Sequence, residues 1–310
     1  MSKLTKALTA AAGNAGGDPL YAEDVFSTYL YTGTGSAMTI TNGVNLEDNG
    51  GIVWTKPRTA SGESHRLIDA DNSTILASDG TNAKLNGSLS VPQYYLQNNT
   101  DGFDLVGNIS VVSGADYASW TFRKAEKFFD VQTYTGNGTA GRTVAHNLGS
   151  VPAVMIVKST TNGAYGWRVY HQSLGNTDYL RLNETNAAAA TAGMWNNTTP
   201  TDSEFTLGGA SVTNGNGESF VAYLFASDAG GFGDDGSENI IKCGSYVGTG
   251  SATVPNHVEL GFEPQYWLIK NTTFAADWWC IDTMRGADYS GTARLFPNTS
   301  GAEVAAGLNV

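Results

Sequence analysis

Short apolar runs, mostly about five to eight residues long, recur along the chain and are rich in valine, isoleucine, threonine and aromatic residues. Clusters of glycine, asparagine, aspartate and serine separate these runs, as at 41–43 and 214–217. Such clusters are typical of tight turns between antiparallel strands. Some runs alternate apolar and polar residues, whereas others, such as 151–157, are apolar on both faces. The pattern predicts an all-β fold of tandem antiparallel β-sandwich, jelly-roll-like domains.

Helical periodicity is nearly absent. Residues 3–12 are one exception, because their spacing predicts a short amphipathic helix. The alanine-rich stretch 187–194 is the other, and we expect one or two helical turns there. The glycine-rich stretch 13–19 predicts a flexible joint before a first strand near 25–31.

The chain contains three copies of one repeat. Tyr31, Tyr134 and Tyr246 each begin a Tyr-x-Gly-x-Gly motif, at intervals of 103 and 112 residues. A lysine follows each of these anchor tyrosines after 24 or 25 residues and closes an apolar run; the three are Lys56, Lys158 and Lys270. A period of this length predicts tandem domains, because about 100 residues can bury a core whereas shorter solenoid repeats cannot.

The repeats define the domain organisation that we expect. Residues 1–24 form an N-terminal anchoring arm, 25–127 form unit 1, 128–235 form unit 2, and 236–310 form a partial unit 3. Units 1 and 2 end in matching runs around Trp120 and Tyr223, and no such run follows in unit 3. Two interpretations stay open: the chain is a piece of a longer one, or another chain completes unit 3.

Composition excludes several functions. Only 15% of the residues are charged, and 29 acidic side chains outnumber 17 basic ones, for a formal net charge of -12. Nucleic acids and anionic membranes attract basic surfaces, so we expect no nucleic-acid partner. The apolar runs are shorter than the roughly 18 residues of a membrane span, so we expect no membrane insertion. The first residues lack the apolar stretch of a signal peptide, so no cleaved signal is expected.

The histidines do not indicate catalysis. His146 and His257 occupy the same place in successive repeats, which favours a side chain that caps a turn. Asp69, His171 and Asp282 share another repeated position, where a polar acceptor without a fixed identity is expected. No convergent pair of carboxylates stands out. We therefore predict a non-enzymatic protein with no catalytic residues and no cofactor.

One acidic cluster is a weak candidate for a metal site. Asp234, Asp235 and Glu238 lie among glycines where unit 2 ends, and their oxygens could bind a hard cation. The spacing does not match an EF-hand. We favour the alternative of a solvated acidic linker whose glycines make turns.

Several aromatic side chains are candidates for ligand binding or for an interface. Adjacent residues of a strand point to opposite faces, so one ring of each aromatic pair should face away from its sheet's core. Such a ring can pack on a neighbouring domain, on another chain or on a ligand such as a sugar. The candidates are Tyr94, Trp167, Trp195, Trp278 and Trp279.

The two cysteines occupy positions that are apolar in the other repeats. Cys243 corresponds to Val131, and Cys280 corresponds to Leu67 and Val169. Both are therefore interpreted as buried thiols that act as small hydrophobic residues. A disulfide between them would require their strands to face each other.

The ordered set of motifs resembles the repeated module of tail-fibre and virion structural proteins of tailed bacteriophages, particularly those of marine bacteria. The resemblance covers essentially the whole chain. It implies a β-rich appendage subunit in the virion, made in the host cytoplasm, that forms a homotrimer. Its partners would be other tail proteins, through the N-terminal arm, and a host-surface glycan or protein. The motifs lie at 2–7, 12–17, 24–28, 128–152, 170–175 and 228–239.

The leading hypothesis is therefore a non-enzymatic tail-fibre or tail-appendage subunit that contributes to host attachment. A capsid or tail decoration protein, or an adaptor, is the main alternative, and a high copy number without host binding would distinguish it. A glycan depolymerase on the same scaffold would cleave host polysaccharide. A bacterial surface adhesin would need an export signal, which the sequence does not show.

Overall fold

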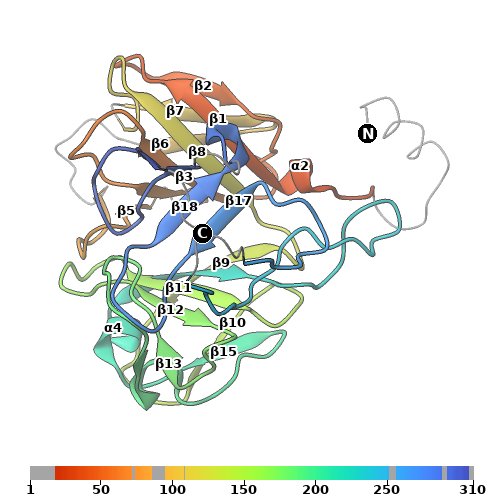
Figure 1. Ribbon diagram of the computed structural model, residues 1–310. Coiled ribbons are helices and arrows are strands. Elements are labelled where there is room, and N and C mark those ends of the chain that lie inside the picture. The colour runs from red at the N-terminus through yellow and green to blue at the C-terminus, as the bar shows by residue number, and fades with distance from the viewer. Residues whose placement is uncertain are drawn as a thin grey trace.

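The computed structural model describes residues 18–71, 74–85, 95–107, 109–250, 256–287 and 292–306. The chain folds into stacked antiparallel sheets, which confirms the all-β sandwich architecture (Figure 1). The described helices are single turns, and none is long and apolar enough to cross a membrane. The expected helix at 3–12 lies outside the described residues.

Unit 1 is a two-layered sandwich. Its larger sheet has the strand order β1-β8-β3-β4-β5, and its smaller sheet has the order β2-β7-β6. Between them lies a core that includes Tyr31, Val53 and Phe103. Its elements are α2 (Ala22–Val25), β1 (Phe26–Thr32), β2 (Met38–Thr41), β3 (Gly51–Pro57), β4 (Arg66–Asp69), β5 (Ile75–Ala77), β6 (Tyr95–Asn99), β7 (Gly102–Val106) and β8 (Asp116–Arg123).

Unit 2 repeats this plan. Its larger sheet has the order β12-β11-β16-β9, and the pairs β10-β15 and β13-β14 form smaller sheets. The elements are β9 (Phe129–Thr135), β10 (Arg142–Ala145), β11 (Val154–Ser159), β12 (Arg168–His171), β13 (Asp178–Tyr179), β14 (Ala189–Ala190), α3 (Ala192–Trp195), β15 (Glu204–Leu207), α4 (Ser211–Asn214) and β16 (Ser219–Phe225). The expectation of one or two helical turns within 187–194 is only partly right: Ala189–Ala190 form β14, and the single turn α3, which Thr191 caps, begins at Ala192.

Unit 3 contributes fewer strands. It has two two-stranded sheets, β17-β18 and β19-β20, and a 3-10 turn that follows β18. Figure 1 shows β17 and β18 between the large sheets of units 1 and 2. The elements are β17 (Tyr266–Ile269), β18 (Trp279–Asp282), η2 (Thr283–Arg285), β19 (Thr292–Arg294) and β20 (Val304–Ala306).

All three units share a central core. Trp54 and Trp120 enter it from unit 1, Ile156 and Tyr223 from unit 2, and Cys280 from unit 3. Each large sheet is therefore buried on both faces, because one face covers its own unit and the other covers the shared core. This explains why the run is apolar from 152 to 157, whereas Val151 before it is exposed.

Strand β11 shows both faces of this arrangement. Ile156 packs in the shared core, whereas Met155 and Val157 pack in the core of unit 2. Neighbouring residues of a strand point to opposite sides, so both faces of the middle of β11 are apolar, and its polar residues Lys158 and Ser159 come at its end.

The register of the strands confirms the repeat. Trp54 of β3 pairs with Leu67 on one side and with Trp120 on the other. In the same way, Ile156 of β11 pairs with Val169 and with Tyr223. These pairings place Trp120 and Tyr223 at the same position of their sheets, as the sequence predicts.

The anchor tyrosines of the first two units make the same contacts. Tyr31 donates its hydroxyl hydrogen bond to the Ser110 carbonyl at 2.9 Å and stacks on Tyr117, with ring centroids 5.0 Å apart. Tyr134 donates to the Thr213 carbonyl at 2.7 Å. It stacks on the ring of Phe220 at 5.2 Å. The repeated tyrosine therefore ties its strand to the loop that leads into the closing strand.

Candidate functional site

The most extensive networks of polar contacts in the described chain lie at the boundaries between the units. Trp167 of unit 2 donates its indole hydrogen bond to the Ala77 carbonyl of unit 1 at 2.9 Å. Trp278, at the same repeat position in unit 3, donates to the Arg181 carbonyl of unit 2 at 2.8 Å. Each acceptor follows a buried leucine of the previous unit. The same hydrogen bond, from a tryptophan indole to a backbone carbonyl, therefore joins unit 2 to unit 1 and unit 3 to unit 2.

The third boundary closes the ring, because unit 1 also contacts unit 3. In unit 1, His65 occupies the repeat position that Trp167 and Trp278 occupy in the other two units. It is fully buried and accepts the indole hydrogen bond of Trp54 at 3.0 Å. Ser78 donates its hydroxyl hydrogen bond to the Pro297 carbonyl at 2.5 Å. The amide of Gly62 donates to the Ser300 carbonyl at 3.0 Å. The three units are thus arranged cyclically around the shared core.

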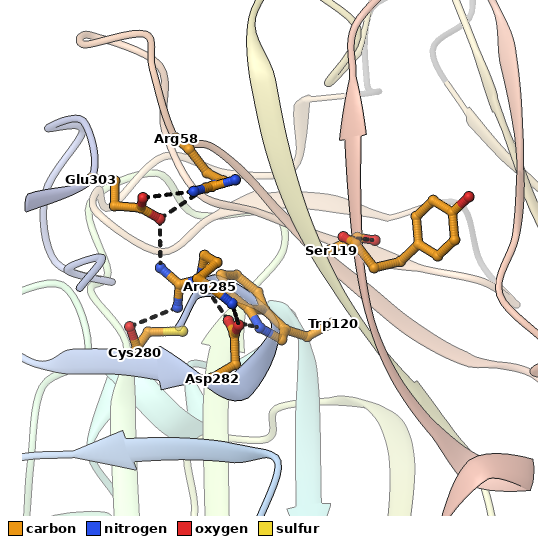
Figure 2. A network of polar contacts seen from close by, with 8 residues as sticks. Arg58, Ser119, Trp120, Cys280, Asp282, Arg285 and Glu303 are labelled. Carbon is orange, nitrogen blue, oxygen red and sulfur yellow. Dashed lines mark hydrogen bonds and ion pairs between the residues drawn. The ribbon is translucent and has the colours of Figure 1, made fainter. Parts of the chain in front are cut away.

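An ion-pair network reinforces this third boundary (Figure 2). Asp282 ends β18 and is fully buried. One of its carboxylate oxygens accepts hydrogen bonds from the Trp120 indole at 2.9 Å and from the Arg285 guanidinium at 2.6 Å. The other oxygen accepts from the Arg285 backbone amide at 2.9 Å, which caps η2. The short turn after β18 therefore places the arginine over its own acidic partner.

Two further charged residues extend the network towards the surface. Arg285 approaches Glu303 at 3.2 Å, and Arg58 of unit 1 binds the same carboxylate through two hydrogen bonds of 2.9 Å each. Arg285 also donates to the Cys280 carbonyl at 3.0 Å, and its guanidinium lies 5.2 Å from the centre of the Trp120 ring. Two arginines thus balance two carboxylates, which a buried ionic network requires.

The chemistry of the neighbouring groups is structural. Burial raises the pKa of the Cys280 thiol to about 12, so the sulfur stays protonated near neutral pH. Burial lowers the pKa of His65 well below its usual value, and the charges of Lys56 and Arg285 lower it further. The thiol is a poor nucleophile and the imidazole is a poor base.

The repeated lysines are part of the same construction. Lys56 donates to the Pro57 carbonyl at 3.0 Å, Lys158 to the Ser159 carbonyl at 2.6 Å, and Lys270 to the Asn271 carbonyl at 2.8 Å. Each ammonium group thus bonds to the carbonyl of the next residue. The repeated lysine that the sequence shows thus fixes the end of its strand, and we call it the strand-end lysine.

The burial of these lysines predicts an unusual dependence of the free energy of unfolding on pH. Burial lowers the pKa of Lys56 and of Lys158 from 10.5 to about 8. Between those values the unfolded chain holds protons that the folded chain has released, so the free energy of unfolding rises with pH. We expect a gain of about 1–2 kcal/mol for each lysine between pH 8 and 9.5. Urea unfolding at a series of pH values measures it.

The matched variant for this prediction is Lys158→Met, which should make the rise smaller. Above about pH 10 the trend should reverse, because burial raises the pKa of Tyr134 and Tyr223 well above the usual value and the unfolded chain then loses those protons. The buried Cys280 thiol, whose raised pKa acts in the opposite direction, is present in both proteins, so an equal pH dependence of Lys158→Met and the unchanged protein between pH 8 and 9.5 would contradict this interpretation of the lysines.

The candidate aromatic residues lie mostly inside the molecule. Trp167 and Trp195 are fully buried, and Trp278 is 4% exposed. Trp167 and Trp278 pack between units, and Trp195 donates to the Asp178 carbonyl at 3.0 Å within unit 2. These three rings therefore do not form a surface for a sugar. Trp279 is partly buried, with the Arg294 guanidinium 4.4 Å from its ring centre, and Tyr94 lies outside the described residues.

The acidic cluster does not converge. Asp234 accepts a hydrogen bond from the Tyr21 hydroxyl, and Asp235 caps the backbone amide of Ser237 at 3.0 Å. The side chain of Glu238 lies beside Gly233, whose φ of 79° requires a glycine. No group of three potential metal ligands occurs within the described part of the chain. Asp235 thus caps a turn, and Asp234 holds Tyr21.

The polar acceptors predicted from the repeat are confirmed. Asp69 accepts the backbone amide of Asp71 at 2.8 Å, and His171 accepts that of Ser173 at 3.1 Å, as Asp282 does for its own turn. His146 accepts the amide of Leu148 at 3.3 Å, which is the expected turn cap. Both cysteines are free thiols.

Sequence reasoning missed the outer part of the network. Nothing in the sequence marks Arg58, Arg285 or Glu303, because each occurs in only one unit. A repeated signal for the boundaries was nevertheless present. A leucine followed three residues later by Asn or Asp occurs in all three units, as Leu76 and Asp79, Leu180 and Asn183, and Leu295 and Asn298. The two asparagines accept the backbone amides of Trp167 and Trp278.

A shallow hollow of about 440 Å³ lies where units 1 and 2 meet, lined in part by basic residues. Arg123 donates there to the Asp24 carbonyl and to the Asn49 side chain. Lys124 pairs with Asp71 at 2.6 Å. Arg123 and Lys124, two of the cations that line this hollow, thus already bind groups of the same chain.

Comparison with known proteins gives one match. Residues 21–310 match the family described as a domain of unknown function, DUF7483. No curated protein and no solved structure matches the chain.

Proposed function

The chain belongs to the DUF7483 family of domains of unknown function, and from its own sequence and structure we propose that it is a non-enzymatic structural subunit of a bacteriophage tail fibre or tail appendage. In this proposal the subunit assembles as a homotrimer in the virion. It docks to other tail proteins through its N-terminal residues and contributes to attachment to a glycan or protein of the host surface.

One observation carries the proposal: buried polar contacts hold three β-units in a fixed arrangement around a shared core. Asp282 and Glu303 of unit 3 accept hydrogen bonds from Trp120 and Arg58 of unit 1. Trp167 and Trp278 supply bonds across the other two boundaries. An appendage needs rigid and repetitive parts, and the phage-like motifs along the whole chain support that use. The net charge of -12 favours solubility of the subunit.

The N-terminal residues offer a direct test. Leu20 accepts the Gly233 amide at 2.8 Å through its carbonyl, and the Tyr21 hydroxyl donates to Asp234. The backbone of Leu20 and the side chain of Tyr21 are thus bound to the body of the protein, so we assign the docking role to the residues that precede them. A deletion of residues 1–17 should prevent incorporation into virions and leave the unfolding temperature of the purified protein unchanged.

The control deletion removes residues 1–24, which also breaks the contacts with Gly233 and Asp234 and should lower the unfolding temperature. Incorporation is measured by immunoblotting of purified particles from cells that express each form. If the protein lacking residues 1–17 enters particles at the normal level, the docking role is wrong. If the intact protein never enters particles, the structural role itself is wrong.

A further inference from the structure

Two arginines of unit 2 lie directly opposite each other on neighbouring segments of the chain. Val169 and Leu180 exchange both backbone hydrogen bonds, each 2.9 Å long, so the next pair along the two segments is Arg168 and Arg181. The Cβ atoms of such a pair lie about 5 Å apart, and like charges placed there repel each other. Burial lowers the pKa of Arg168, and the charge of Arg181 lowers it further. A negative charge beside the pair would remove this cost.

One tyrosine holds both guanidinium groups in place. The centre of the Tyr179 ring lies 5.5 Å from the Arg168 guanidinium and 5.0 Å from that of Arg181. The Tyr179 hydroxyl accepts a hydrogen bond from Arg181 at 2.8 Å, and the residue is only 8% exposed. Contact with one buried ring restricts both arginine side chains, so binding of a ligand would require little further ordering.

The chain supplies only one carboxylate to these two cations. Glu184 approaches Arg181 at 3.5 Å, and its side chain is 39% exposed, so this ion pair is weak. Among the described residues Arg168 has no carboxylate within ion-pair distance, and its guanidinium donates to the Trp167 carbonyl at 2.9 Å. The buried Nε of Arg168 has no hydrogen-bond partner in that part of the chain. The network around Asp282 differs, because two arginines there face two carboxylates.

The other two units do not contain this pair of cations. In unit 1 the residue equivalent to Arg168 is Arg66, and Ala77 lies opposite it. In unit 3 the equivalent residue is Trp279, and the Arg294 guanidinium lies 4.4 Å from the centre of its ring. The fold of the repeat therefore does not need two cations at this position. Their presence in unit 2 indicates a use other than packing.

We propose that Arg168 and Arg181 form a binding site for a small ligand that carries a carboxylate or a phosphate group. Parallel N–H donors of a guanidinium match the oxygens of either group, and an anion between the two guanidiniums can bind both. Both side chains are partly exposed, so a ligand can reach them. The ligand supplies the second negative charge at this pair of arginines. This inference does not depend on the phage role proposed above.

Isothermal titration calorimetry of the full chain tests the site with three related sugars. Glucuronate carries a carboxylate, glucose 1-phosphate carries a phosphate, and glucose is neutral. We expect at least one of the charged sugars to bind and glucose to give no heat of binding. The affinity should fall as sodium chloride is added, because salt screens partly exposed charges. Tighter binding of one charged sugar identifies the anion that the site prefers.

A matched pair of variants locates the binding. Arg168→Gln should weaken the affinity for the charged sugar at least about tenfold, because charge-assisted hydrogen bonds are lost. Arg66→Gln removes the equivalent arginine of unit 1, which has no opposing cation, and should leave the affinity unchanged. The urea midpoint of each variant without ligand shows whether it is folded.

A measurement on the unchanged protein does not depend on the folding of a variant. In NMR spectra, the Nε–H signals of Arg168 and Arg181 should shift when the charged sugar is added, and the signal of Arg66 should stay in place. The proposal is wrong if neither charged sugar binds, or if glucose binds as tightly as they do. It is also wrong if both variants bind equally, or if the sugar shifts other arginine signals and not these two.

Discussion

Replacing Asp282 by alanine is expected to lower the free energy of unfolding by about 3–5 kcal/mol, the cost of leaving one member of a buried ion pair without its partner. The Arg285 guanidinium would lose its closest carboxylate, and the Trp120 indole would lose its acceptor. Both groups are buried, so water cannot replace the lost bonds. Urea unfolding followed by fluorescence measures the loss.

The matched control is Asp71→Ala, which removes a surface ion pair with Lys124 and should cost about 1 kcal/mol or less. A second variant separates charge from packing. Asp282→Leu combined with Arg285→Met leaves no unpaired charge at this point and should recover most of the stability. Equal costs for Asp282→Ala and Asp71→Ala would show that the network does not hold unit 3 to unit 1.

The second large effect is expected at Trp167, where alanine should cost about 3–5 kcal/mol. The side chain is fully buried between units 1 and 2, donates to the Ala77 carbonyl and lies 6.4 Å from the Tyr223 ring. Its loss leaves a cavity in the shared core and an unpaired carbonyl in unit 1. The measurement is again the urea midpoint, together with the slope of the transition.

Trp279→Ala provides the comparison, because it removes the same kind of side chain from a partly buried position. It loses one contact with the Arg294 guanidinium and should cost only about 1 kcal/mol. If Trp279→Ala is as costly as Trp167→Ala, the shared core is not the main source of stability in this part of the molecule.

The repeat made much of the fold predictable. The strand-end lysines and the acceptors at Asp69, His171 and Asp282 recur in the sequence because each solves the same local problem in every unit, and the anchor tyrosines do so in units 1 and 2. Their spacing therefore predicted both the strands and the alignment of the units. The pattern of apolar and polar positions also predicted stacked antiparallel sheets, but it predicted tandem domains and not one core shared by three units.

The placement of the tryptophans could not be predicted in the same way. Whether an outward-facing ring meets solvent or another unit depends on how the units pack, and that is decided by contacts far apart in the sequence. Trp167 is covered by unit 1, and Trp278 is covered by unit 2. The salt bridge between Arg58 and Glu303 joins residues 245 positions apart, and neither has a counterpart in another unit.

The central claim is that three repeats fold around one shared core, and scanning calorimetry of the intact protein tests it most directly. The account predicts a single transition whose calorimetric enthalpy equals its van't Hoff enthalpy, because no unit can lose its contacts alone. Two or three separate transitions, each with the enthalpy of about 100 residues, would contradict the account and show that the units are independent domains.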